Sequence, residues 1–307
     1  MIRAIAPLLA LAVIGAAWGA TQPFAKIAVS EGARPLGILI WQNLIVAGVL
    51  GALVLIRGKR LPWTAAHLRL YLVIALIGSL LPGMASYSAA VHLPSGVLSI
   101  LLSTVPMLAF PIALLLGLEG FRARRLLGLS LGMIGVSLLI LPEQGLPASV
   151  APIWVGVALI SSGFYAMEGN YVAKWGTEGL DAMQVLTGAS LVGLVLTVPL
   201  ALVSGQGFVL AAGGWTAPDI AIVASSVLHA GAYSGYVWLV GFAGPVFAVQ
   251  VSYLVTVFGV GWAMLFLGEG YSGWFWAALA SLLMGMALVQ PRRKTLADDR
   301  QRGNTAV

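Results

Sequence analysis

The segment PMLAFPIALLLGLEGFRARRLLGLSLGMIGVSLLI, residues 106–140, holds two apolar runs joined by a short charged stretch. A second segment, TVFGVGWAMLFLGEGYSGWFWAALASLLMGMALVQ, residues 256–290, repeats this plan. Glu119-Gly120 aligns with Glu269-Gly270 at an offset of 150 residues, and Gly135 aligns with Gly285 at the same offset. Self-similarity at a fixed separation predicts an internally duplicated fold.

The composition indicates a chain that is mostly surrounded by lipid. Of its 307 residues, 60% are hydrophobic and 8% are charged, with a mean hydropathy of +0.99. Soluble domains carry about three times that share of charge. There is no cysteine, which excludes disulfides and thiolate sites. The net charge of +6 is scattered over short loops, so it favours a role in membrane topology over nucleic-acid binding.

A helix that crosses a bilayer needs about 20 mostly apolar residues. Such runs occur ten times, and we predict a transmembrane helix for each: 4–24, 36–56, 70–91, 95–118, 124–142, 153–174, 182–204, 219–242, 245–267 and 273–290. The predicted fold is therefore an all-α integral membrane protein. Residues 1–142 form one five-helix repeat, residues 153–290 form a second, and residues 291–307 form a polar tail.

Five is an odd number, so the second repeat enters the membrane from the opposite side. Two inverted five-helix repeats around a central cavity are typical of secondary transporters. Fourteen of the 16 Lys and Arg residues fall on the N-terminal side of the predicted membrane, and Lys26 and Arg34 fall on the other. Basic residues accumulate in cytoplasmic loops, which predicts a multi-pass inner-membrane protein with both termini in the cytoplasm and no cleaved signal peptide.

Polar and aromatic side chains inside the predicted spans are candidate substrate contacts, because they are costly in lipid. Glu168 shares a helix face with Tyr165 and lies about 9 Å before Lys174 at the end of its span. His229 and Tyr233 share a face of another span. Aromatic rings stack on planar ligands and attract ammonium groups. The predicted substrate-binding residues are Trp18, Gln22, Tyr87, Tyr165, Glu168, His229, Tyr233, Trp238, Gln250 and Tyr253.

Helix packing is the alternative interpretation of the same residues. Small residues let membrane helices approach closely, and Ser, Tyr and Gln form hydrogen bonds between helices. Glu168 fits a transport role or a role in an inner gate, and His229 fits proton coupling or a structural hydrogen bond. Three prolines interrupt the third and fourth spans and are candidate hinges or static kinks: Pro82, Pro106 and Pro111.

The repeated unit, a span followed by LGLEGF or LGEGYS and a second span with an internal glycine, resembles the EamA family of the drug/metabolite transporter superfamily. The segment AAWGATQPFAKIA, residues 16–28, strengthens this resemblance, which covers residues 4–290. Leu118 departs from it, since glycine usually precedes the glutamate. The resemblance implies a ten-helix inverted-repeat carrier that exports small metabolites, often amino acids. Its cavity would be formed mainly by the first, third, fourth, sixth, eighth and ninth helices.

Several classes of function lack their motifs. The chain has no G-x-x-x-x-G-K loop for ATP, no H-E-x-x-H or G-x-S-x-G motif, and no His-rich ligand cluster, so we predict no catalytic residue, metal or cofactor. The partners expected are the bilayer, a small-molecule substrate and protons as a candidate coupling ion. We predict a secondary transporter that exports amino acids by alternating access, with aromatic or large apolar ones favoured and the aromatic amino acid exporters as the candidate subgroup. Exporters of purine-like metabolites, sugars or cationic drugs are the alternatives, followed by a channel or a membrane enzyme.

Overall fold

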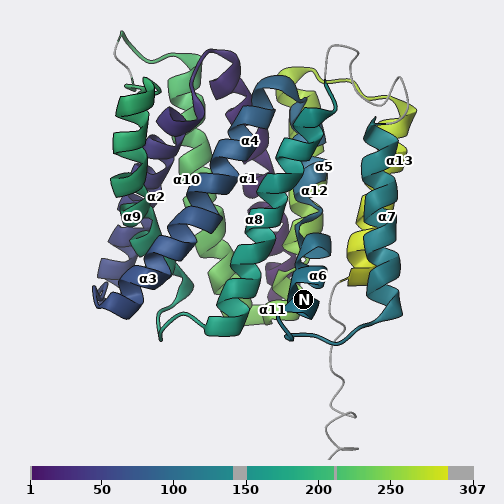
Figure 1. Ribbon diagram of the computed structural model, residues 1–307, viewed down its shortest axis with the longest axis horizontal. Helices are drawn as coiled ribbons and strands as arrows, with labels where there is room; N and C mark the ends of the chain where they lie inside the picture. The colour runs from purple at the N-terminus through teal and green to yellow at the C-terminus, as the bar shows by residue number, and fades with distance from the viewer. Residues whose placement is uncertain (1, 141–150, 211–212, 290–307) are drawn as a thin grey trace, which may run out of the picture.

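The computed structural model describes residues 2–140, 151–210 and 213–289, so the predicted tail at 291–307 lies outside the described residues. Within these ranges the chain is built of helices and contains no β-strand (Figure 1). The helices are α1 (Ile2–Ser30), α2 (Pro35–Ile56), α3 (Ala65–Ile74), the π-helical segment η1 (Ala75–Leu80), α4 (Leu81–His92), α5 (Ser95–Leu102), α6 (Val105–Leu115), α7 (Ala123–Ile140), α8 (Ile153–Trp175), α9 (Ala182–Ser204), α10 (Ala217–Ala243), α11 (Pro245–Ala248), α12 (Val251–Leu267) and α13 (Gly273–Val289).

In the described part of the chain, seven helical segments are long and apolar enough to cross a membrane. Two further apolar helices, α12 and α13, have 17 residues each, and α8 has 23 residues with Glu168 and Lys174 among them. Every sequence-predicted span overlaps one helix or a run of consecutive helices. The predicted all-α membrane fold is thus confirmed at this level of detail.

Local signals in the sequence explain where several helices begin and end. Asp181 and Gln184 form a capping box at the start of α9, in which each side chain accepts a hydrogen bond from the other residue's backbone N–H. The glycines after α9 and α12, Gly205 and Gly268, adopt the left-handed conformation with a φ of 64° each. Glycine takes this conformation without steric cost, so both helices stop there.

The third and fourth predicted spans are irregular helices. The third passes from α3 through the π-helical segment η1 into α4, with Pro82 in the first turn of α4. The fourth is broken between α5 and α6 at Ser103 and Thr104, and Pro106 and Pro111 lie in α6. The hydroxyl groups of Ser103 and Thr104 donate to backbone carbonyls one turn earlier, each at 2.6 Å. Side chains thereby satisfy carbonyl groups at the break, as the interior of a membrane protein requires.

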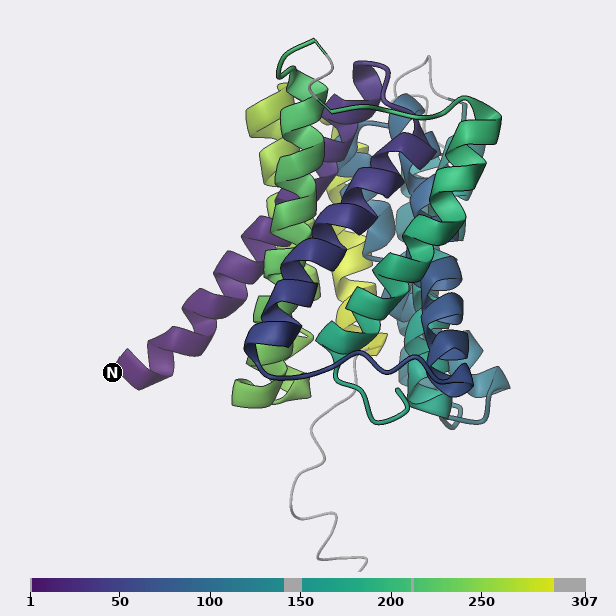
Figure 2. The same cartoon turned by 90° about the vertical axis from the view of Figure 1, so that its left-hand side faces the viewer.

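Glycines allow the closest helix contacts. A methyl group added to Gly19 of α1 would lie 2.8 Å from the backbone nitrogen of Gly259 in α12, so no larger residue fits there without a shift. The Trp262 indole of α12 donates a hydrogen bond of 2.9 Å to the Ala16 carbonyl of α1. The packing interpretation of the α1 glycines is therefore confirmed at Gly19. At its N-terminal end α1 leans away from the bundle (Figure 2), where Val13 is 67% exposed.

The turn between α4 and α5 is held by charges of opposite sign on its two helix ends. The Lys26 ammonium of α1 donates to the Ala90 carbonyl near the end of α4, at 2.7 Å. The Glu269 carboxylate accepts hydrogen bonds from the backbone N–H groups of Ser95 and Gly96 at the start of α5, at 2.8 and 3.1 Å. A cation at a helix C-terminus and an anion at a helix N-terminus both interact favourably with the helix dipole. This turn therefore ties α1 to the loop between α12 and α13.

We expect Glu269→Gln to loosen the α4–α5 turn. Hydrogen bonds to a charged group contribute about 1.5–3 kcal/mol, so amide exchange at Ser95 and Gly96 should accelerate about tenfold or more. Hydrogen–deuterium exchange of the purified protein in detergent measures this. Glu119→Gln is the matched control, because Glu119 occupies the equivalent repeat position but forms an ion pair with Arg125 of α7. Equal exchange in both variants would show that Glu269 does not hold the turn.

Candidate functional site

An aromatic cluster joins α1 and α10 in the middle of the bundle. The Trp18 indole N–H of α1 donates a hydrogen bond of 3.1 Å to His229 Nδ1 of α10. The Tyr233 ring meets Trp18 edge-on at 6.3 Å between centroids, and the Tyr236 ring lies 5.9 Å from it. Because Nδ1 of His229 accepts a hydrogen bond, the neutral imidazole carries its proton on Nε2 and presents a second donor. The cluster therefore combines ring edges with hydrogen-bond donors.

Glu168 of α8 faces the π-helical segment η1. A methyl group added to Gly78 would lie 2.6 Å from the Glu168 Cδ and Oε1 atoms, so the carboxylate rests on bare backbone. The half-buried Glu168 side chain has no hydrogen bond or ion pair within the described part of the chain. The Tyr165 and Tyr233 hydroxyls lie close enough to interact with its charge. Glu168 thus connects the α8 side of the bundle with the aromatic cluster.

A second polar group lies between α2 and the third span. The Tyr87 hydroxyl of α4 donates to Gln42 Oε1 at 2.6 Å, and the Ser79 hydroxyl of η1 donates to Asn43 Oδ1 at 3.2 Å. The buried Asn43 Nδ2 has no hydrogen-bond partner. Sequence reasoning missed Gln42 and Asn43, although two adjacent amides inside an otherwise apolar span were a usable signal. Tyr87 also lies within electrostatic range of Tyr165, which links this group to Glu168.

No hydrogen bond or ring contact within the described part of the chain links the other four predicted site residues to these groups. Trp238 is 51% exposed and stacks on Phe242 at 5.1 Å between ring centroids. Gln250 is exposed in the turn between α11 and α12, and Tyr253 packs against the main hydrophobic core. Gln22 of α1 is half-buried and its amide has no hydrogen-bond partner among the described residues. Contacts join Trp18, His229 and Tyr233, and electrostatic interactions link Tyr233 to Glu168, Glu168 to Tyr165 and Tyr165 to Tyr87, so six of the ten predicted residues are connected.

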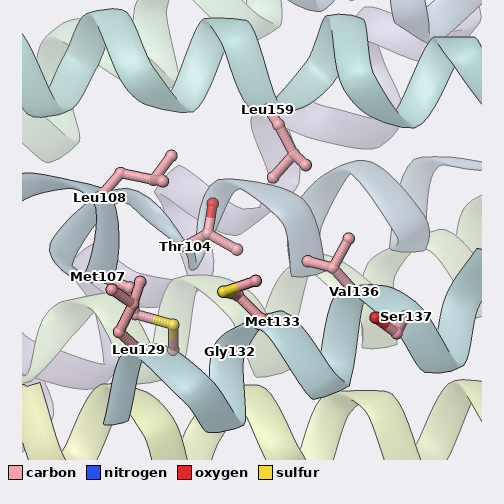
Figure 3. Close-up of a pocket in the computed structure, with 9 residues that line it drawn as sticks. All are labelled: Thr104, Met107, Leu108, Leu129, Gly132, Met133, Val136, Ser137 and Leu159. Atoms are coloured by element: carbon pink, nitrogen blue, oxygen red, sulfur yellow. The ribbon is translucent and has the colours of Figure 1, made fainter. Parts of the chain in front are cut away.

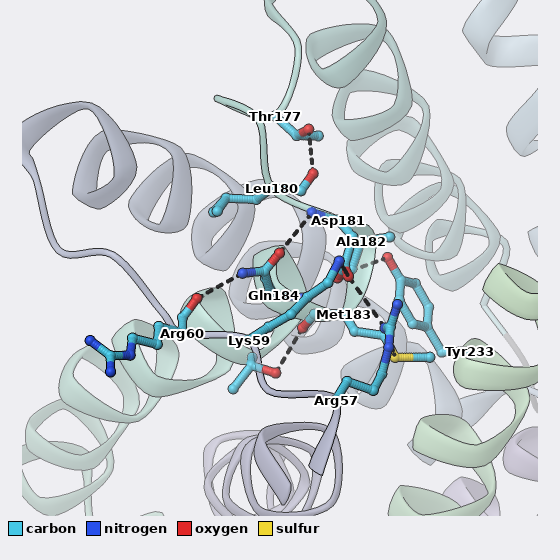
Figure 4. A network of polar contacts seen from close by, with 11 residues as sticks. Arg57, Lys59, Arg60, Thr177, Leu180, Asp181, Ala182, Met183, Gln184 and Tyr233 are labelled. Atoms are coloured by element: carbon cyan, nitrogen blue, oxygen red, sulfur yellow. Dashed lines mark hydrogen bonds and ion pairs between the residues drawn. The ribbon is translucent and has the colours of Figure 1, made fainter. Parts of the chain in front are cut away.

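An ion-pair network anchors the start of α9 beside the aromatic cluster (Figure 4). Asp181 Oδ2 lies 2.7 Å from Lys59 Nζ and 3.2 Å from an Arg57 guanidinium nitrogen. Burial alone would raise the pKa of Asp181, but the hydrogen bonds from Lys59 and the Gln184 backbone and the two nearby charges together hold it below its usual value. The Tyr233 hydroxyl donates to the adjacent Ala182 carbonyl at 3.4 Å. The network therefore positions one wall of the candidate site.

A hollow of about 250 Å³ lies elsewhere, between α6, α7 and α8 (Figure 3). It contains none of the predicted site residues. Its lining is apolar except for two hydroxyl groups and consists of Thr104, Met107, Leu108, Leu129, Gly132, Met133, Val136, Ser137 and Leu159. No group of three or more His, Asp or Glu side chains in the described ranges is arranged to hold a metal ion.

Residues 5–141 match the EamA-like transporter family. This match spans the helices from α1 to α7, which contain the first five predicted spans. The chain is also similar to the uncharacterized inner membrane transporter YedA of Escherichia coli K12, with 26% identity over 289 residues that cover 89% of this chain and 86% of YedA. YedA of the O157:H7 strain matches equally well. A crystal structure with 20% sequence identity superposes on 95% of this chain and 98% of its own, with a TM-score of 0.62.

The EamA-like domain and the similarity to YedA identify the protein as a membrane transporter and not an enzyme. The crystal structure extends the likeness of fold over nearly the whole chain, including the half that the family match does not cover. The aromatic cluster and Glu168 are therefore candidates for substrate contacts in a transporter.

We expect Asp181→Asn to weaken the anchor of α9, because asparagine keeps the N-cap and removes the charge. The partly exposed ion pairs contribute about 1 kcal/mol or less, so the loss is a small decrease in Tm at neutral pH. The folded-state pKa of Asp181 lies below its ordinary value of 3.8, so the difference between wild type and variant should disappear as the pH falls through that lowered pKa.

Thermal unfolding in detergent at several pH values measures this effect. Glu178→Gln is the control, since Glu178 pairs with the exposed Arg69 at 3.5 Å. A difference that persists in acid would contradict the electrostatic account of the anchor.

Proposed function

We propose that this transporter exports amino acids, with aromatic or large apolar ones favoured, by alternating access. The observation that carries the proposal is the Trp18–His229 hydrogen bond between α1 and α10, in a cluster whose Tyr233 interacts electrostatically with Glu168 of α8. Ring edges suit an apolar or aromatic side chain, and the nearby donors and carboxylate suit the polar groups of an amino acid. Protons are the candidate coupling ion.

The helix contacts support two inverted five-helix repeats. Equivalent helices of the two halves pack in pairs: α2 with α9, α5 with α12, and α7 with α13. The contact between α1 and α10 also has its counterpart between α8 and α4. An inverted repeat places the substrate site at the interface of the two halves, which is where the aromatic cluster and Glu168 lie.

The distribution of basic loops supports cytoplasmic termini. The start of α1, the α2–α3 loop and the α6–α7 loop lie at the same end of the bundle (Figure 1). The two loops carry Arg57, Lys59, Arg60 and Arg122. A basic face of this kind is the cytoplasmic one in most membrane proteins. The name of YedA supports placement in the inner membrane.

Interruptions in two of the spans provide points at which the helices can bend during alternating access. The fourth predicted span is interrupted between α5 and α6, and the ninth between α11 and α12. We propose Pro82, Pro106 and Pro111 as hinges, because each lies in or beside an irregular part of its span. The Ser162 hydroxyl of α8 donates to the Leu101 carbonyl at the first break, at 3.0 Å. A break that is already satisfied by side chains can bend without exposing backbone groups to lipid.

We expect Tyr233→Ala to lower the rate of amino-acid counterflow in proteoliposomes about tenfold, because it removes a ring edge and a hydroxyl from the cluster. Phe242→Ala is the matched control, since Phe242 is 60% exposed and stacks only on Trp238. Wild-type counterflow in Tyr233→Ala would remove this residue from the site.

The same assay separates the alternative functions. A carrier saturates with substrate and shows counterflow, whereas a channel does neither. Labelled aromatic and branched amino acids, a purine, a sugar and a permanently charged cation form the panel. Counterflow with one of the last three and with no amino acid would replace the proposed substrate class, and the absence of counterflow with saturation would contradict the carrier mechanism.

A further inference from the structure

Glu168 is the one Asp, Glu, Lys or Arg side chain of the described ranges that lies deep in a helix. Every other described one lies in a loop or within five residues of a helix end. Glu168, by contrast, is seven residues from the end of α8 and faces the segment η1 in the interior of the third span. A charge inside a membrane protein is costly unless a partner compensates for it. Glu168 has no such partner within the described ranges.

The equivalent contact in the other half is satisfied. There, the Trp18 indole of α1 donates to His229 on the facing helix α10. Glu168 instead meets Gly78, which offers no side chain, within a π-helical turn. π-helical turns are frequent at functional sites because they disturb the regular backbone ladder. The structure therefore places a carboxylate where no hydrogen bond or ion pair from the described residues compensates its charge.

We propose that Glu168 binds the protonated amine of the transported molecule, so that the substrates are organic ammonium compounds with an apolar or aromatic body. This inference rests on the proposed function and narrows it. The Tyr165 and Tyr233 side chains lie within electrostatic range of the carboxylate, and aromatic rings also attract a cation. The Trp18 ring packs edge-on against Tyr233 and provides an apolar surface for the apolar part of the substrate.

The distribution of charged residues also indicates which group of an amino acid is dispensable. No Lys or Arg of the described ranges lies near the middle of a membrane span to pair with a substrate carboxylate. Neutral donors are present, such as the Tyr165 hydroxyl, which has no hydrogen-bond partner among the described residues, and the Nε2 of His229. Hydrogen bonds from neutral donors suit an amide or ester as well as a carboxylate. The amine is therefore required for recognition, and the negative charge of the carboxylate is not.

Ligands that share one body and differ in charge test this proposal. Binding to the purified full chain in nanodiscs is measured for phenylalanine, phenylalanine amide and 3-phenylpropionate, and for leucine, leucine amide and 4-methylpentanoate. In at least one series, we expect the amide to bind as tightly as the amino acid. The acid without an amine should bind about tenfold more weakly or worse, which is the range of a charge-assisted hydrogen bond.

Variants of the carboxylate and its support make the assignment specific. Glu168→Gln should weaken binding of the amine-bearing ligands about tenfold and leave the deaminated acids unchanged. Gly78→Ala keeps the carboxylate but places a methyl group 2.6 Å from its Cδ, so it should also weaken the amines. Gly163→Ala on the same helix α8 is the matched control, because nothing lies within 4 Å of the added methyl group.

Each outcome decides the proposal. Equal binding of the deaminated acids and the amides, an unchanged preference in Glu168→Gln, or no binding by any amine in either series would overturn it. Counterflow measured in parallel tests export independently. If export persists while the amine preference is absent, the ammonium site is wrong and the proposed function stands. If export is absent while the amines bind through Glu168, the ammonium site stands and the proposed export function is wrong.

Discussion

Lipid offers no hydrogen bonds, so each backbone N–H and C=O group in the bilayer core needs a partner within the protein. This constraint explains why the described chain consists of helices and why its irregular points carry hydroxyl side chains. Where α5 ends, the Ser103 and Thr104 hydroxyls and the Ser162 hydroxyl of α8 all reach carbonyl groups of α5. The break in the fourth span is therefore a stable part of the fold and can serve as a point of bending.

The same constraint applies to charge. Lys26 and Glu269 lie at helix ends, where each compensates the dipole end of a helix at the α4–α5 turn. Asp181 is compensated by Lys59 and by backbone N–H groups at the start of α9. Glu168 follows neither pattern, because it lies deep in α8 against a glycine. Its lack of compensation is what connects the architecture of the bundle with recognition of a cation.

Much of the fold follows from hydropathy alone. Runs of about 20 apolar residues predicted the helical segments, and the loops between them carry the caps and glycines that end them. The irregular segments within the third and fourth spans did not follow from hydropathy. The π-helical turn at Ala75–Leu80 and the break at Ser103 come from how neighbouring helices pack, and proline positions indicated only that these spans are irregular. The polar stripes predicted the aromatic cluster in part, since Trp238 is equally aromatic but faces outward.

The sequence by itself determined the all-α membrane fold and the presence of an unusual carboxylate in a span, and it predicted the internal duplication, because composition and spacing along one chain carry that information. Only the tertiary structure decided which polar residues meet. His229 and Trp18 lie 211 positions apart in the sequence and share a hydrogen bond. Glu168 is uncompensated because the helix that faces it presents Gly78, and helical periodicity cannot show which residue of a distant helix lies opposite a side chain.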